Sequence, residues 1–189
     1  MRYCTKPLSL LLLLWLIIGQ ALADGIQVDK AQVRQSEDGY QLAVEYDINL
    51  SFALQQALSR GISLYFVSEF SLTRSRWYWL DEDLYHSEQA AKFSYNVLTR
   101  QYRISRGALY QNFDSLDEAL NTLARQSSGM IPAAMLDKTN NYVAEVRLRL
   151  DTTQLPKLLQ VNALTGRDWN LDSETYRWAV RFNSEGRAE

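Results

Sequence analysis

The chain has 189 residues, 22% of them charged and 47% hydrophobic, with a formal net charge of −2 at pH 7. This length suits one domain with a sizeable core, and the slight acidic excess argues against nucleic acid, whose binders carry a basic surface. A single cysteine, Cys4, and a single histidine, His86, exclude a disulfide framework and any metal site built from several thiols or imidazoles.

The N-terminal segment is typical of a secretory signal peptide. Arg2 and Lys6 make a basic start, residues 8–18 form an apolar run, and Ala21 and Ala23 mark a small-residue cleavage site. The run is too short to span a bilayer comfortably, although an uncleaved anchor is the alternative. We therefore expect a signal peptide over 1–23, one domain over 24–183, a flexible tail over 184–189, and a periplasmic location.

Apolar and polar side chains alternate with a period of two along much of the remaining chain, which predicts half-buried strands. The pattern is clearest over residues 40–50, 142–151 and 176–182, and the polar face of each favours antiparallel sheets. An earlier strand over 26–33 changes phase between Val28 and Ala31, which predicts a bulge or an early end. Gly39 closes a predicted hairpin turn.

The middle of the chain predicts more strands and two helices. Residues 62–72 form another apolar strand face. Residues 91–104 predict a hairpin that turns at 98–101, and Gly107 allows a bend before a strand over 109–113. Ser51 caps a helix over 52–60, and residues 115–118 form a capping box. Residues 130–141 are expected to be a loop, and 153–166 to contain at most a short helical turn at 155–159.

These elements predict a mainly β protein: an antiparallel β-sandwich with two short helices. An immunoglobulin-like topology is one form of it, although the cysteine pair that would support it is absent. The glycines are too dispersed for a phosphate-binding loop, and no serine lies in a G-x-S-x-G elbow. We expect no catalytic residue, no metal and no cofactor.

The candidate functional stretch is residues 64–86. Asp81, Glu82 and Asp83 could serve as a carboxylate pair on a glycosidic bond, or could be the solvated charges of a turn, offsetting nearby arginines. Trp77 and Trp79 could stack on a sugar or anchor a peptide, or could belong to the core. His86 is interpreted as a surface residue.

Arginines recur in the following hairpin, at Arg100, Arg103 and Arg106. They could lie close to Arg74 and Arg76 and hold a carboxylate or phosphate. The alternative is cross-strand pairing with the acidic residues. The apolar run over 150–171 is expected to close one end of the sandwich, or else to form a flap that binds a partner.

Three blocks resemble one known family: residues 61–83 (GISLYFVSEFSLTRSRWYWLDED), 93–120 (FSYNVLTRQYRISRGALYQNFDSLDEAL) and 146–171 (VRLRLDTTQLPKLLQVNALTGRDWNL). The family is a domain-of-unknown-function family of small exported proteobacterial proteins. The resemblance implies a single exported domain and assigns no catalytic residue. Because genes of such proteins often lie near a two-component sensor kinase, it implies that kinase as a partner to test.

We therefore expect an exported, non-enzymatic binding or interaction module, with an unknown envelope protein as partner and a membrane contact only through the signal peptide. The alternative is a carboxylate-based hydrolase of an envelope glycan. The candidate binding surface comprises Arg74, Arg76, Trp77, Trp79, Asp81, Glu82, Arg100 and Arg103.

Overall fold

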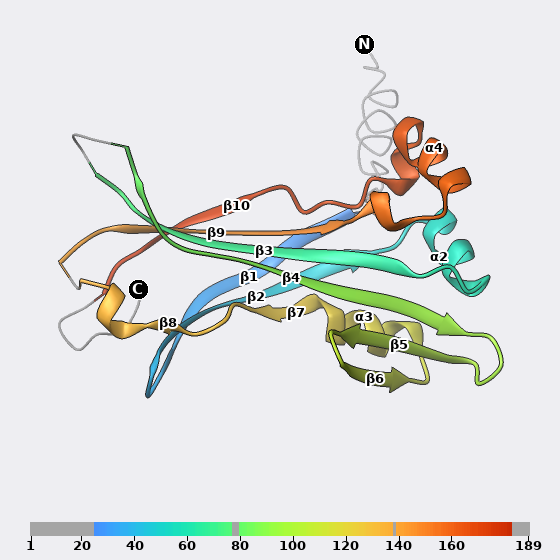
Figure 1. The fold of residues 1–189 in the computed structure, drawn as a ribbon, viewed down its shortest axis with the longest axis horizontal. Coiled ribbons are helices and arrows are strands. Elements are labelled where there is room, and N and C mark those ends of the chain that lie inside the picture. The colour runs from blue at the N-terminus through green and yellow to red at the C-terminus, as the bar shows by residue number, and fades with distance from the viewer. Residues whose placement is uncertain (1–24, 77–79, 138, 183–189) are drawn as a thin grey trace, which may run out of the picture.

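A computed structural model describes residues 25–76, 80–137 and 139–182, which fold as two antiparallel sheets with short helices (Figure 1). The small sheet has the order β1-β2-β7, with β8 also paired to β2. Its strands are β1 (Gly25–Ser36), β2 (Gly39–Asn49), β7 (Arg125–Ser127) and β8 (Ile131–Pro132). The predicted mainly β, antiparallel sandwich is confirmed, and the structure shows it to be an open, sandwich-like one.

The large sheet has the order β10-β9-β3-β4-β5-β6. Its strands are β3 (Leu64–Arg74), β4 (Glu82–Asn96), β5 (Gln101–Arg106), β6 (Leu109–Phe113), β9 (Tyr142–Leu150) and β10 (Tyr176–Val180). Strands β3 to β6 follow one another as neighbours, so this part is a meander, whereas an immunoglobulin domain uses Greek-key connections.

The core lies between the sheets because each strand turns its apolar face inward. In β3 the alternation is complete: Leu64, Phe66, Phe70 and Leu72 are buried, while the residues between them on the other face are half-buried. Strands β2 and β9 contribute apolar faces of the same kind. We call the face of the large sheet turned away from this core the outer face.

Several local predictions are confirmed. The pairing of β1 with β2 shifts register between Val28 and Lys30, so the predicted bulge is present. Ser51 caps α2 (Phe52–Ser59), accepting a hydrogen bond from the Leu54 amide at 3.3 Å. A Cβ on Gly39 would lie 2.2 Å from the Ile131 carbonyl oxygen, so β8 can pair there only with glycine.

Ser115 caps α3 (Leu116–Ala124) through the Glu118 amide at 3.2 Å. The loop expected over 130–141 instead contains β8 and a short 3₁₀ turn, η1 (Ala133–Met135). The described residues also contain a third helix, α4 (Lys157–Thr165), where at most one helical turn was predicted. The apolar period does not reveal α4 because Leu158 faces solvent instead of the core.

The segment after β9 closes one end of the sandwich. It runs through η2 (Thr152–Gln154), α4 and η3 (Arg167–Trp169), and it buries Leu155, Trp169 and Leu171 in the common core. Ser51 ties this segment to α2, because its hydroxyl donates a 2.6 Å hydrogen bond to the Asp168 carbonyl. No helix in the described part of the chain is long and apolar enough to cross a bilayer.

Two buried tyrosines are expected to differ in how much the loss of their hydroxyl changes the free energy of unfolding. Tyr142 donates to the Asp137 carbonyl at 2.8 Å and accepts from the Asp137 amide at 2.6 Å, whereas the buried Tyr46 hydroxyl has no hydrogen-bond partner among the described residues. Tyr142→Phe should lower the free energy of unfolding by about 1–2 kcal/mol. Tyr46→Phe should leave it unchanged or raise it, since no protein hydrogen bond is lost. Urea unfolding of both variants would measure this, and a larger loss for Tyr46→Phe would contradict the assignment.

Candidate binding surface

The predicted site residues at the start of β4 form a tight ion-pair cluster. Arg74 donates from Nε to Glu82 Oε2 at 2.8 Å, and both the Arg74 and Arg76 guanidinium groups pair with that same oxygen. The hydrogen bond from Arg74 is the main reason that the pKa of Glu82 lies below its usual value. Asp81 precedes the strand and accepts from the Arg76 amide at 3.2 Å.

This cluster favours the structural alternative for the acidic triplet. A general acid on a glycosidic bond needs a raised pKa, whereas the pKa of Glu82 is lowered by its two arginine partners. Only Asp81 precedes the strand, because β4 begins at Glu82 and includes Asp83. The triplet is therefore not a turn over its whole length. Trp77 and Trp79, the aromatic part of the predicted site, lie outside the described residues.

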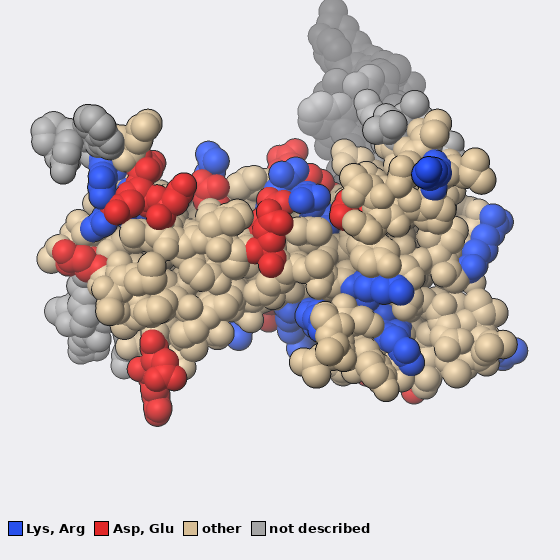
Figure 2. Space-filling model, viewed as in Figure 1, with Lys and Arg blue, Asp and Glu red and all other residues tan. Residues whose placement is uncertain are grey.

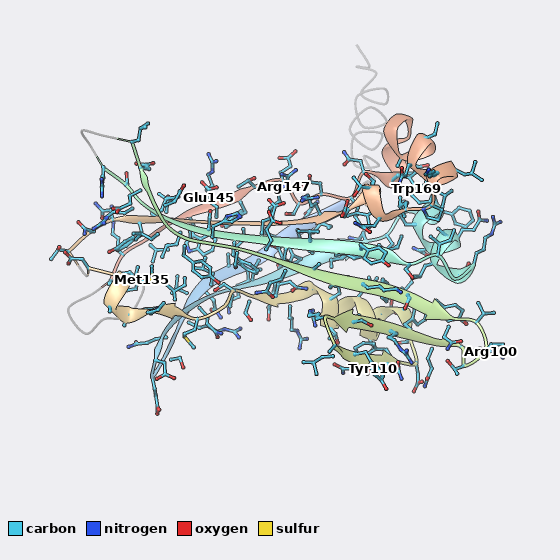
Figure 3. The ribbon with its side chains drawn as sticks, in the orientation of Figure 1. Arg100, Tyr110, Met135, Glu145, Arg147 and Trp169 are labelled. Carbon is cyan, nitrogen blue, oxygen red and sulfur yellow. The ribbon has the colours of Figure 1, made fainter. Side chains whose placement is uncertain are left out.

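Arg100 and Arg103 lie far from this cluster, so the predicted convergence of the arginines is wrong. Glu82 pairs with Arg74 at one end of β4, whereas Ser94 pairs with Arg103 near the other end. The 12 residue steps between Glu82 and Ser94 span roughly 40 Å of strand. Arg100 lies beyond them in the β4–β5 turn, with φ of 55° (Figure 3).

The outer face over β3 and β9 carries a second ion-pair network that the sequence analysis missed. Arg149 Nε donates to Glu69 at 2.6 Å, and Arg147 Nε donates to Asp172 at 3.0 Å. Arg177 and Glu145 form a further pair at 2.7 Å. Each cation here has a carboxylate beside it, so this half of the outer face is neutralised by its own side chains.

A shallow hollow of about 100 Å³ lies within this network, lined by Ser71, His86 and Glu145 among others. The three residues share one row of the outer face because β3 pairs with both β4 and β9. His86 is 62% exposed and lies 3.7 Å from Glu88. No hydrogen bond joins Ser71 to His86 in the described structure, so the row lacks the base contact that activates a serine.

The network makes stability depend on pH through Asp172. The hydrogen bond from Arg147 lowers the pKa of Asp172 below its unfolded value of about 3.9. Its stabilising effect is therefore present above about pH 4 and is lost as the pH falls through the folded pKa. Asp172→Asn should be less stable than the parent at pH 6 by about 1 kcal/mol.

That difference should shrink when the pH is lowered to about 2, because Asp172 of the parent gains a proton as the pH falls through its folded pKa. Urea unfolding of parent and variant at both pH values measures it. Because Glu82 and Asp137 also have lowered pKa values, only the difference between the two proteins isolates Asp172. An equal difference at both pH values would contradict this role of the carboxylate.

The other half of the outer face, over β4 to β6, has a different character. Cross-strand pairing places Tyr65, Lys92, Ser105 and Tyr110 in one row across β3, β4, β5 and β6. The Lys92 ammonium lies 5.9 Å from the Tyr65 ring centre, and the Arg103 guanidinium lies 4.5 Å from that of Tyr110. We call these four residues, Tyr65, Lys92, Arg103 and Tyr110, the cation–aromatic surface.

The cations of this surface have no acidic partner in the described part of the chain. Arg103 Nε donates to the Asn112 amide oxygen at 2.8 Å, which is a neutral acceptor, and the ion pairs of the fold involve neither Arg103 nor Lys92. Tyr110 is 64% exposed. A charged and aromatic surface without counter-ions is suited to an anionic ligand with apolar parts.

Strand β6 adds an open edge to this surface, because it ends the large sheet. Its sequence, LYQNF, contains no charge and no proline, and its register with β5 is regular. Four of its five residues are exposed. Proteins usually protect such edges with charges, bulges or proline, so β6 presents unprotected backbone donors and acceptors to an added strand.

Comparison with known proteins gives one match. A family model described as "Domain of unknown function (DUF4390)" matches residues 23–179, which includes both halves of the outer face. Neither the curated proteins nor the solved structures contain a significant match. In the described part of the chain, no cluster of three or more His, Cys, Asp or Glu side chains could hold a metal ion.

Proposed function

The chain belongs to the DUF4390 family of domains of unknown function, and on this premise we propose that it is a non-enzymatic interaction module that binds an acidic, extended segment of another protein. The segment adds as a strand to β6 and places carboxylates against the cation–aromatic surface. One observation carries this proposal: cations without an acidic partner among the described residues lie next to an unprotected edge of the same sheet.

The geometry supports a strand ligand because Arg103 reaches toward the edge. Arg103 lies on β5, two strand spacings or about 10 Å from a strand added beside β6. Its guanidinium already lies over Tyr110 of β6, on the outer face. A glutamate on the same face of the added strand could therefore reach it, while main-chain hydrogen bonds to β6 would supply affinity.

The place of action follows from the N-terminal sequence. The basic start, the short apolar run and the small residues at Ala21 and Ala23 support export and cleavage after Ala23, hence a periplasmic module. The partner is then an envelope protein. The family resemblance makes an extracytoplasmic segment of a two-component sensor kinase the first partner to test.

The proposal predicts binding of a defined acidic peptide. The probe is a fluorescent octapeptide of alternating Glu and Val, measured by anisotropy with the full chain. Arg103→Gln should weaken binding about fivefold, the loss of roughly 1 kcal/mol expected for a charged contact. The matched control is Arg34→Gln, because Arg34 is exposed on β1 of the small sheet; this variant should bind like the parent.

Two further peptides separate strand addition from simple charge attraction. An alternating Lys–Val octapeptide should not bind, and a Glu–Val octapeptide with every backbone amide N-methylated should bind only weakly, since neither of its edges can donate to β6. Equal binding of the Glu–Val and Lys–Val peptides, or equal affinities of the Arg103→Gln and Arg34→Gln proteins, would overturn the proposal.

A further inference from the structure

Large apolar side chains are exposed on three separate segments at one end of the molecule. Phe52 of α2 is 79% exposed, Leu98 of the β4–β5 turn 95%, and Leu158 of α4 86%. Helices α2 and α4 and the β4–β5 turn lie at the same end of the ribbon in Figure 1. We call the part formed by α2, α4 and this turn the helical end.

The core does not require these three side chains. Helix α2 buries Leu54, Ala57 and Leu58 on its inner side, and the segment around α4 contributes Leu155 and Trp169. Phe52 lies on the other side of α2, and Leu158 of α4 faces solvent. Single exposed apolar residues are common on protein surfaces, but three at the tips of one end form a pattern of their own.

The segments that carry these tips contain basic residues and no acidic ones. Exposed Arg60, Arg100 and Lys157 flank the apolar residues, whereas residues 51–61, 97–101 and 155–167 contain no Asp or Glu. Asp168 is the first acidic residue after them. In Figure 2 the same end shows mainly tan and blue surface with little red, while most of the red side chains lie over the opposite half.

The N-terminal segment joins the fold at this same end. Gly25 starts β1 and pairs with Asn49, which lies just before the Ser51 cap of α2. In the sequence, six residues, 19–24, separate Gly25 from the apolar run over 8–18. Even fully extended, they span only about 20 Å. While that run lies in a bilayer, the helical end is therefore held beside the lipid.

From these observations we infer that the helical end rests on a bilayer surface that contains anionic phospholipid. Phe52, Leu98 and Leu158 enter the boundary between headgroups and acyl chains, and Arg60, Arg100 and Lys157 contact the anionic headgroups. Apolar tips flanked by cations are a composition suited to such a surface. This inference uses a different surface from the strand-binding edge and does not depend on it.

The test measures which end of the full chain touches lipid. In a Cys4→Ser background, an environment-sensitive fluorophore is attached at Thr99→Cys in the β4–β5 turn, or at Asp38→Cys in the β1–β2 turn; both positions are exposed. The proteins are reconstituted into vesicles of phosphatidylcholine with or without phosphatidylglycerol, and quenching by bromine-labelled lipid is recorded. Position 99 should be quenched strongly when phosphatidylglycerol is present, and position 38 should not.

Neutralising the cations is the second part of the test. Arg60→Gln, Lys157→Gln and Arg100→Gln together should reduce quenching at position 99 to the level in pure phosphatidylcholine, since each basic side chain near an anionic surface contributes a roughly fivefold gain in binding. Circular dichroism confirms that each labelled protein is folded. Equal quenching at positions 38 and 99, or quenching at 99 that does not depend on phosphatidylglycerol, would overturn the inference.

Discussion

The pairing of β3 with both β4 and β9 is the constraint on which the rest of the structure depends. Leu64, Phe66, Phe70 and Leu72 of β3 are buried, and this leaves one register for each neighbour, because a slip of one residue would turn the apolar face outward. The same registers place Arg147 and Arg149 of β9 around Glu69. The ion-pair network is therefore a consequence of how the core packs.

The registers also divide the outer face into two electrostatic halves. Over β3, β9 and β10 each described arginine of the network faces a carboxylate, so this half attracts little beyond its own side chains. Over β4 to β6, Lys92 and Arg103 lie against tyrosine rings instead. Neither cation forms an ion pair with a described residue, and this half of the outer face ends at the open edge of β6, which is why we place binding there.

Much of the fold could be predicted from local patterns. The alternation in β2, β9 and β10, the bulge after Val28 and the caps at Ser51 and Ser115 depend on residues close in sequence. Helix α4 was underestimated because its exposed Leu158 breaks the apolar period on which the prediction depends.

The candidate site was harder to predict because it depends on contacts across strands. Arg74 and Arg103 were expected to lie close together if their strands paired, but the 15-residue strand β4 separates them. The row from Tyr65 to Tyr110 can be recognised only when the registers of three strand pairs are known: β3 with β4, β4 with β5, and β5 with β6. Alternation indicates which residues share a face, but it does not indicate which strands are neighbours, so Tyr110 and Lys92 could not be singled out beforehand.

The most direct test of the central claim compares the two edges of the large sheet in living cells. A photo-crosslinking amino acid is placed at Asn112 on β6 or at Ala179 on β10, both exposed on the outer face at opposite edges of the large sheet. Adducts are identified by mass spectrometry. Our account predicts one discrete protein adduct from position 112, mapped to an acidic segment, and none from position 179. An adduct from position 179 alone, or from neither position, would contradict it.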